Sequence, residues 1–256
     1  MPRSTEPKRT HRTLERLKRK TARVTLLLEH HLGIPARRTA STDPLDMLIA
    51  TILSQNTNDR NSHRAYTELR RRYPTWDRVA SAPPAALRSA LRTGGMANLK
   101  SRHIRETLGT IKARYGRYDL GALRKKSSET IIEELTGLNG VGVKTAACVL
   151  LFALRRDVFP VDTHVHRICS RLGLAPGSRN PERTFEAMKE LIPPGKAHSL
   201  HTNMIRFGRT VCRPLSPRCE MCPLYAHCTF DGKSASARPG RGVPSVGRDF
   251  MLLDNV

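Results

Sequence analysis

Two stretches of the sequence carry side chains suited to chemistry on an anionic substrate. The first, LNGVGVKTA at 138–146, delivers Lys144 to the start of the apolar run ACVLLFAL. A lysine there opposes the helix dipole and lies beside apolar side chains. Both effects favour the free amine, which is the nucleophilic form. A solvent-exposed lysine without a chemical role is the alternative, and this stretch alone leaves both interpretations open.

The second stretch, FPVDTHVHR at 159–167, places Asp162 where an apolar approach gives way to a predicted helix. Aspartate is a favoured N-cap, so capping is a sufficient structural reason for this residue. A carboxylate near a nucleophilic amine can also act as a base or stabilise positive charge. We therefore treat Asp162 both as a cap and as a candidate catalytic carboxylate.

Four of the six cysteines form a third motif, C-x6-C-x2-C-x5-C. They are Cys212, Cys219, Cys222 and Cys228. We expect an intracellular chain, in which thiols packed this densely bind a metal because disulfides would be reduced. Zinc and an iron–sulfur cluster both remain open, although the long, irregular spacings favour the larger cluster. The other two cysteines, Cys148 and Cys169, are predicted to be buried apolar residues.

Two glycines a residue apart distinguish the turn before Lys144. Such a turn leaves backbone N–H groups unobstructed at the entrance of a helix, where they can hold a phosphate without side chains. A simple connector between helices is the alternative. The candidate phosphate-binding residues of this turn are Leu138, Gly140, Val141, Gly142 and Val143.

The overall charge points to a polyanionic partner. The chain of 256 residues has 45 Lys and Arg against 22 Asp and Glu, a formal net charge of +23. Residues 1–24 hold nine of the basic residues and two of the acidic ones, so a basic tail explains only part of the excess. Nucleic acid is therefore the first partner to consider. The longest apolar stretch, 146–154, is too short to cross a membrane, and no secretory signal is visible.

These residues must be positioned by helices, because no stretch shows the alternation typical of strands. Apolar spacing, Pro and Gly positions and potential caps predict an all-α chain. Asp43 and Pro44 are predicted as the N-cap and first residue of one helix. Helices are expected at 13–32, 44–54, 64–73, 76–80, 84–91, 101–115, 128–135, 145–154, 164–172, 181–191 and 198–210.

The three motifs, in this order and at these separations, resemble the endonuclease III family of helix-hairpin-helix DNA glycosylases with a [4Fe-4S] cluster. The match runs from about Leu45 to Cys228. The resemblance implies an all-α fold of two domains: a six-helix barrel domain at 37–156, and an iron–sulfur cluster domain formed by 13–36 with 157–230. Residues 1–12 and 231–256 fall outside and are expected to be disordered.

The resemblance also implies roles for single residues. Lys144 matches the nucleophile, Asp162 the catalytic carboxylate, and the turn at 138–143 the element that grips DNA backbone. ILSQNTND at 52–59 matches the family segment whose glutamine fills the gap left by an extruded nucleotide. GMANLKS at 95–101 matches the family loop that wedges the opposite strand. We expect Gln55 or Asn56 as the plug and Met96 as the wedge; a direct alignment puts Asn56 at the glutamine position.

The implied function is excision of oxidised pyrimidines, of the thymine glycol type, followed by cleavage of the abasic site through a lysine Schiff base. The partner would be double-stranded DNA with a damaged base or an abasic site, bound by a monomer. We expect a cytoplasmic location, associated with the nucleoid in a bacterium, and leave an organelle or the nucleus open. A mismatch-specific glycosylase or a noncatalytic DNA-binding member of the superfamily is the alternative.

Overall fold

The computed structural model describes residues 6–37 and 42–233. Every regular element in these ranges is helical, and none of them is a strand, which confirms the predicted all-α class. The described residues form two compact units, one of residues 6–37 and 157–233 and the other of residues 42–156. Within the same ranges, no helix has both the length and the apolar character needed to cross a bilayer.

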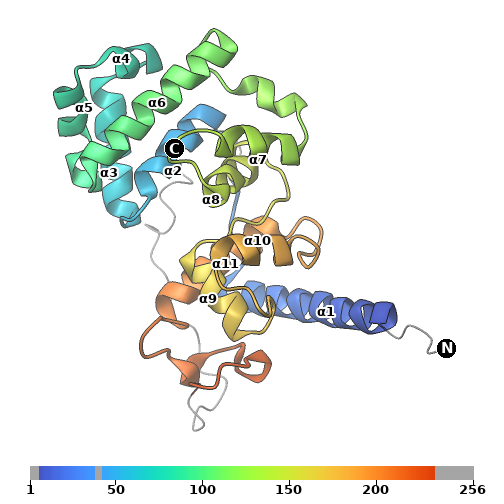
Figure 1. The fold of residues 1–256 in the computed structure, drawn as a ribbon. Coiled ribbons are helices and arrows are strands. Elements are labelled where there is room, and N and C mark those ends of the chain that lie inside the picture. Colours follow the sequence, from blue (N-terminus) through green and yellow to red (C-terminus); the bar gives the residue numbers. More distant parts are fainter. Residues whose placement is uncertain (1–5, 38–41, 234–256) are drawn as a thin grey trace. The chain divides into compact units, whose positions relative to one another are not determined.

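The first unit pairs the N-terminal helix with the C-terminal part of the chain (Figure 1). Its α-helices are α1 (Glu6–Leu32), α9 (Thr163–Arg171), α10 (Pro181–Met188) and α11 (Ala197–Thr210). Helix α11 lies at the centre of this unit, because it packs against both α1 and α9. The short helical turns η4 (Cys219–Met221) and η5 (Tyr225–His227) follow it.

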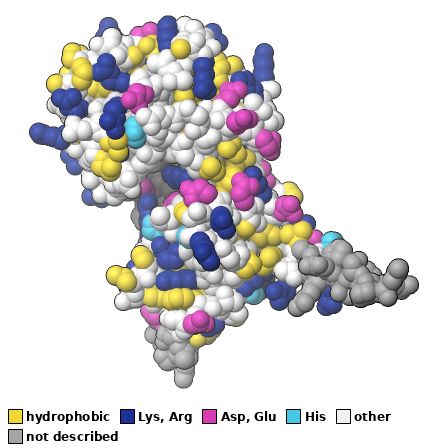
Figure 2. All heavy atoms as spheres, in the orientation of Figure 1, with side chains coloured by type: hydrophobic (Ala, Val, Ile, Leu, Met, Phe, Trp, Pro, Cys, Tyr) yellow, Lys and Arg dark blue, Asp and Glu magenta, His cyan; other side chains and the backbone are white. Residues whose placement is uncertain are grey.

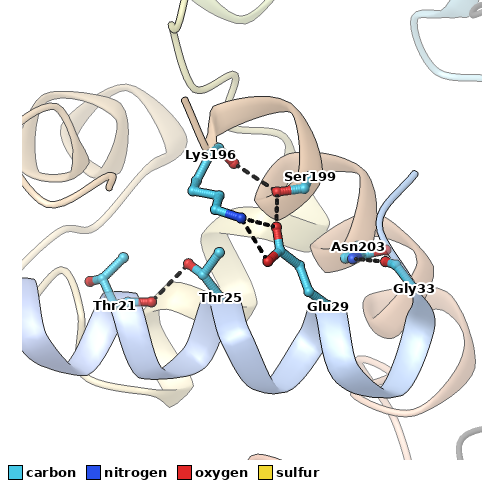
Figure 3. Close-up of polar contacts among 7 residues, drawn as sticks. All are labelled: Thr21, Thr25, Glu29, Gly33, Lys196, Ser199 and Asn203. Atoms are coloured by element: carbon cyan, nitrogen blue, oxygen red, sulfur yellow. Dashed lines mark hydrogen bonds and ion pairs between the residues drawn. The ribbon is translucent and has the colours of Figure 1, made fainter. Parts of the chain in front are cut away.

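A polar seam joins α1 to α11. Glu29, although only 8% of its side chain is exposed, accepts hydrogen bonds from Lys196 Nζ at 2.9 Å and from the Ser199 hydroxyl (Figure 3). Asn203 donates from Nδ2 to the carbonyl oxygen of Gly33 at 2.9 Å. A buried carboxylate needs such partners, so these contacts fix the position of α1 along α11.

The extent of α1 corrects one expectation. Residues 6–12 were expected to be disordered because they are basic and nearly free of apolar side chains, but α1 begins at Glu6. Once the later turns pack through Val24 and Leu28, each added residue gains a backbone hydrogen bond without a new nucleation cost. Residues 1–5 and 234–256 lie outside the described residues, so the remaining parts of both predicted tails stay predictions.

The second unit contains the helices before and after the predicted hairpin. They are α2 (Pro44–Ser54), α3 (Asp59–Arg72), α4 (Trp76–Ser81), α5 (Pro84–Ala90), α6 (Ala97–Tyr115), α7 (Ser128–Thr136) and α8 (Val143–Cys148), with the short turns η1 (Arg92–Gly94) and η2 (Gly121–Lys125). Helix α2 is the core element, because it packs against α3, α6 and α8.

The local sequence explains why α2 forms where it does. Asp43 Oδ1 accepts hydrogen bonds from the N–H groups of Leu45 and Asp46, and Pro44 occupies the first turn, as predicted. Nine of the eleven residues of α2 are buried. Its two ends are therefore fixed relative to the core, and the polar segment that follows Ser54 starts from a rigid point.

The apolar run after Lys144 does not continue as one α-helix. Helix α8 ends at Cys148 and becomes the π-helical segment η3 (Val149–Ala153). Val149, Leu150 and Leu151 are at most 1% exposed, so this segment is a buried support under α8. The wider turn of a π-helix changes the direction in which the following side chains leave the axis.

Candidate active site

A tight turn links α7 to α8 and forms the predicted hairpin. Leu138 and Val141 are buried, at 4% and 5% exposure, and the N–H of Val141 donates to the carbonyl of Leu138 at 3.1 Å. The apolar pair therefore anchors the turn while its outer backbone faces solvent. Within the described structure, the N–H groups of Gly140, Gly142 and Val143 have no hydrogen-bond partner. Three free donors at one helix entrance can bind an anion.

Two features of the turn, a positive φ angle and the lack of space for a Cβ, require glycine at position 140. Its φ angle is +78°, and a Cβ placed on it would lie 2.3 Å from Nδ1 of His103. The histidine ring of α6 thus packs directly against the turn. In contrast, Gly142 has an extended backbone (φ −94°) and open space around it. The first glycine shapes the hairpin, and the second keeps its outer side unobstructed.

Gln55 ties the end of α2 to this hairpin. Its side-chain Nε2 donates to the carbonyl oxygen of Gly140 at 2.9 Å and lies 3.3 Å from the hydroxyl oxygen of Thr145, which follows Lys144. One amide therefore fixes both sides of the turn that presents the lysine. Its neighbour Asn56 is exposed and adopts a left-handed backbone with φ of 52°. The structure thus separates the two candidates for the plug by their surroundings.

Met96, the predicted wedge, is the residue before α6. It is 47% exposed and has a left-handed backbone with φ of 50°. A large apolar side chain at this exposure loses favourable burial, and its backbone conformation is rare outside glycine. Met96 is thus one of four exposed large apolar side chains among the described residues.

Lys144 is the second residue of α8 and is half-buried. The residues after it, Thr145, Ala146 and Ala147, are all buried, so the backbone that carries the lysine is held by the core. No side chain caps α8, and no acidic residue lies in its first turn. The amine is therefore mounted on rigid backbone next to the free N–H groups of the hairpin.

Asp162 belongs to the unit formed by residues 6–37 and 157–233. It is the N-cap of α9, as predicted, and its Oδ1 accepts a hydrogen bond from the N–H of Val165 at 2.8 Å. This bond uses one carboxylate oxygen, and the side chain stays half-buried rather than enclosed. His164, two residues on, has its pKa lowered mainly by burial. The cap is thus observed, while a catalytic role for Asp162 remains a prediction.

The four cysteines of the third motif follow α11 around η4 and η5. Burial, together with smaller effects of the nearby thiols Cys212, Cys228 and Cys219, raises the pKa of Cys222 to about 12, so the four sulfur atoms share one neighbourhood. Among the described residues, no three His, Cys, Asp or Glu side chains are grouped tightly enough for a single metal ion. Cys148 and Cys169 are buried apart from them, as expected.

Two arginines of α9 support the cysteine loop and were not identified from the sequence. Arg167 donates to the carbonyl oxygens of Gly208 and Cys212, both at 2.9 Å. Arg171 donates from Nη1 to the sulfur of Cys212 at 3.3 Å, and its guanidinium lies 4.3 Å from the centre of the Phe230 ring. Their i, i+4 spacing on one face of the predicted helix was the available signal, although 41 residues separate Arg171 from Cys212.

The charge of the chain is spread over both units. Figure 2 shows Lys and Arg side chains distributed over the visible surface, with fewer Asp and Glu side chains between them. The excess is therefore not confined to one terminus, in agreement with the count from the sequence. Surfaces of this kind attract polyanions over distances of about 10 Å at moderate salt.

A family model and two relatives match the chain by sequence. A family model described as HhH-GPD superfamily base excision DNA repair protein matches residues 49–194, which include the hairpin and Asp162. Endonuclease III of Thermotoga maritima is 39% identical over 194 residues, which cover 76% of this chain and 86% of that protein. Endonuclease III of Sulfolobus acidocaldarius is 31% identical, with 72% and 80% covered.

A solved structure extends the similarity to the fold. The chain matches a non-covalent endonuclease III–DNA complex with a TM-score of 0.71 and 26% identity, over 83% of this chain and 95% of that one. The predicted helix-hairpin-helix glycosylase fold is thereby confirmed.

Proposed function

Because the chain belongs to the endonuclease III family within the HhH-GPD superfamily of base excision DNA repair proteins, we propose that it is a bifunctional DNA glycosylase and abasic-site lyase. Its substrates are double-stranded DNA with an oxidised pyrimidine of the thymine glycol type, and DNA with an abasic site. The observation that carries the proposal is the position of Lys144, on core-supported backbone directly after a hairpin with free N–H groups.

DNA binding follows from the hairpin and the charge. The N–H groups of Gly140, Gly142 and Val143 bind phosphate oxygens of the damaged strand, while Leu138 and Val141 keep the turn anchored. The net charge of +23 adds an affinity that does not depend on sequence and falls with salt. Phosphate contacts at the hairpin place C1′ of the extruded nucleotide within reach of Lys144.

Lys144 performs the covalent chemistry. Its free amine attacks C1′, the bond between C1′ and the base nitrogen breaks, and the base leaves with that electron pair and takes up a proton. The sugar ring opens to give a Schiff base between Nζ and C1′. Loss of a C2′ proton then expels the 3′ phosphate, and hydrolysis of the imine frees the enzyme. Splitting the reaction in this way is typical of amine nucleophiles.

Asp162 assists through the carboxylate oxygen that the helix cap leaves available. It accepts a proton from the attacking amine and stabilises the positive charge that develops on the sugar. The bond from Val165 fixes the carboxylate, so its orientation is set before DNA binds.

Extrusion of the nucleotide leaves a gap in the duplex. We assign the plug to Asn56 rather than Gln55, because Asn56 is exposed while Gln55 is tied to the hairpin. Met96, exposed on a left-handed backbone, is the wedge in the opposite strand. Inserted side chains offset part of the unstacking cost, which is a few kcal/mol.

The four thiols fit a [4Fe-4S] cluster. They lie near one another, and the guanidinium of Arg171, which donates to the sulfur of Cys212, would offset part of the negative charge of the thiolates. Cys212, Cys219, Cys222 and Cys228 would hold the cluster. When bound, it supplies a cross-link that orders the cysteine loop. Arg167 and Arg171 hold the start of that loop by donating to the backbone carbonyls of Cys212 and Arg213.

Borohydride trapping tests this function. Reduction during incubation with abasic or thymine glycol DNA should convert the Schiff base into a stable protein–DNA complex, and Lys144→Ala should abolish it. A wild-type protein that binds DNA without trapping, and releases no base, would be a noncatalytic DNA-binding module. Release of a mismatched normal base instead of thymine glycol would favour a mismatch-specific glycosylase.

A further inference from the structure

Lys100 is a buried lysine with no part in the proposed chemistry. It lies in α6, is 2% exposed, and donates from Nζ to the carbonyl oxygens of Leu53 and Gly94, both at 2.7 Å. Burial lowers the pKa of Lys100. A buried ammonium group is unfavourable unless it is hydrogen-bonded, so these two bonds are what allow it here.

The two carbonyls belong to the segments that carry the plug and the wedge. Leu53 lies in the last turn of α2, three residues before Asn56. Gly94 ends η1, two residues before Met96. Both oxygens are at helix ends, where carbonyls lack a partner within the helix. One side chain therefore joins two turns that are about 40 residues apart in the sequence.

Both segments also hold an unfavourable backbone conformation. Asn56 and Met96 are two of only four non-glycine residues with positive φ in the described ranges. The turn before Met96 is tightly packed as well, because a Cβ on Gly94 would lie 3.0 Å from Cβ of Ala65. Strained conformations persist only where the surroundings over-determine them.

We propose that Lys100 is a positioning residue that locks the Asn56 turn and the Met96 turn into one rigid pair. The inference rests on the proposed function, in which these residues enter the two DNA strands. The three donors of an ammonium group can hold two carbonyls at once, which no apolar side chain of similar length can do. Because the pair is set before binding, plug and wedge enter the duplex together.

The consequence differs between substrates. A lesion stacked in a duplex must be extruded while both side chains fill the space, so uncoupling the two turns slows its processing. A lesion in a one-nucleotide bulge is already partly unstacked and needs less help. Loss of Lys100 should therefore change the ratio of the two rates, whereas general damage to the fold would lower both together.

The test compares single-turnover cleavage of thymine glycol paired with adenine and of thymine glycol in a bulge. We expect Lys100→Met to lower the ratio of the paired rate to the bulged rate by about tenfold relative to wild type. The matched control is Lys112→Met, which removes an exposed lysine from the same helix and should leave the ratio unchanged.

If Lys100→Met melts below the assay temperature, Lys100→Gln replaces it, because the glutamine amide keeps donors for one of the two carbonyls. The ratio of paired to bulged rate for Lys100→Gln should then lie between wild type and the loss of about tenfold expected for Lys100→Met. An equal loss on both DNAs, or an unchanged ratio, would overturn the positioning role while leaving the proposed function intact. A wild-type protein that cleaves neither DNA contradicts the proposed function, and the inference fails with it.

Discussion

Gln55 Nε2 donates to the carbonyl oxygen of Gly140 at 2.9 Å, although the two residues are 85 positions apart. The same nitrogen lies 3.3 Å from the hydroxyl of Thr145, next to Lys144. The end of α2 thus fixes the hairpin and the first turn of α8 together. Asn56, one residue later, is left exposed. Adjacent amide residues therefore have different surroundings.

Gln55→Leu should loosen the hairpin. It removes the tie to Gly140 and leaves that carbonyl without its partner, so we expect a loss of about 1–2 kcal/mol in the free energy of unfolding, together with weaker DNA binding. Urea unfolding and a binding titration measure both. Asn56→Gly, which keeps the left-handed backbone accessible, should have the opposite profile, with stability nearly unchanged and excision from duplex DNA slowed. If Gln55→Leu left stability unchanged and only Asn56→Gly lowered it, the assignment would be reversed.

Gly140→Ala should damage the hairpin, and Gly142→Ala should spare its stability. Alanine at 140 combines a φ of +78° with a clash against His103, so we expect a loss of about 2 kcal/mol or more. Alanine at 142 meets no atom within 4 Å. Thermal unfolding of the two variants provides the comparison, and similar melting temperatures would contradict the observed turn.

Substitutions of Asp162 can separate its two roles. Asparagine caps helices about as well as aspartate, so Asp162→Asn should fold with nearly wild-type stability but lose most of the excision rate with the charge. Asp162→Ala loses the cap as well and should unfold about 1 kcal/mol more easily. Single-turnover rates and urea unfolding measure the two effects. An Asp162→Asn enzyme as fast as wild type would restrict this residue to capping.

His198 should make stability depend on pH. Burial, with a smaller effect from Arg37, lowers its pKa to about 4 from an ordinary value of 6.5. Between these values the unfolded chain binds a proton that the folded chain does not, so stability falls as pH falls from 6.5 towards 4. His198 alone should cost about 2 kcal/mol between pH 7 and pH 5. Urea unfolding at the two pH values should show that His198→Gln loses about 2 kcal/mol less stability than wild type. Equal losses in the two proteins would contradict the lowered pKa of His198.

Local patterns were sufficient for two helix starts and their caps, whereas α3 and α6 begin several residues before the predicted starts at 64 and 101. Asp43 with Pro44, and Asp162 before THVHR, were predicted as helix starts because a cap depends only on neighbouring residues. The start of α1 was wrong by seven residues, since helix propagation from a packed segment leaves no apolar signal. The π-helical segment after Cys148 was likewise not visible, because an apolar run fits either helix type.

The tertiary contacts of the candidate site were beyond the sequence. Gln55 and Asn56 are chemically alike, and only the contact with Gly140 distinguishes them. Lys100 is one of 45 basic residues, most of them expected on the surface, and its burial depends on two carbonyls brought together by the fold. Such residues can be found only once distant segments are placed in space.

The position of the covalent bond to DNA tests the central claim most directly. The borohydride-reduced complex with abasic DNA can be digested, and the peptide that carries the nucleotide adduct can be sequenced by mass spectrometry. We predict a single adduct on Nζ of Lys144, in the segment after the hairpin. An adduct on another lysine or on the N-terminal amine, with Lys144 unmodified, would contradict the assignment of the nucleophile.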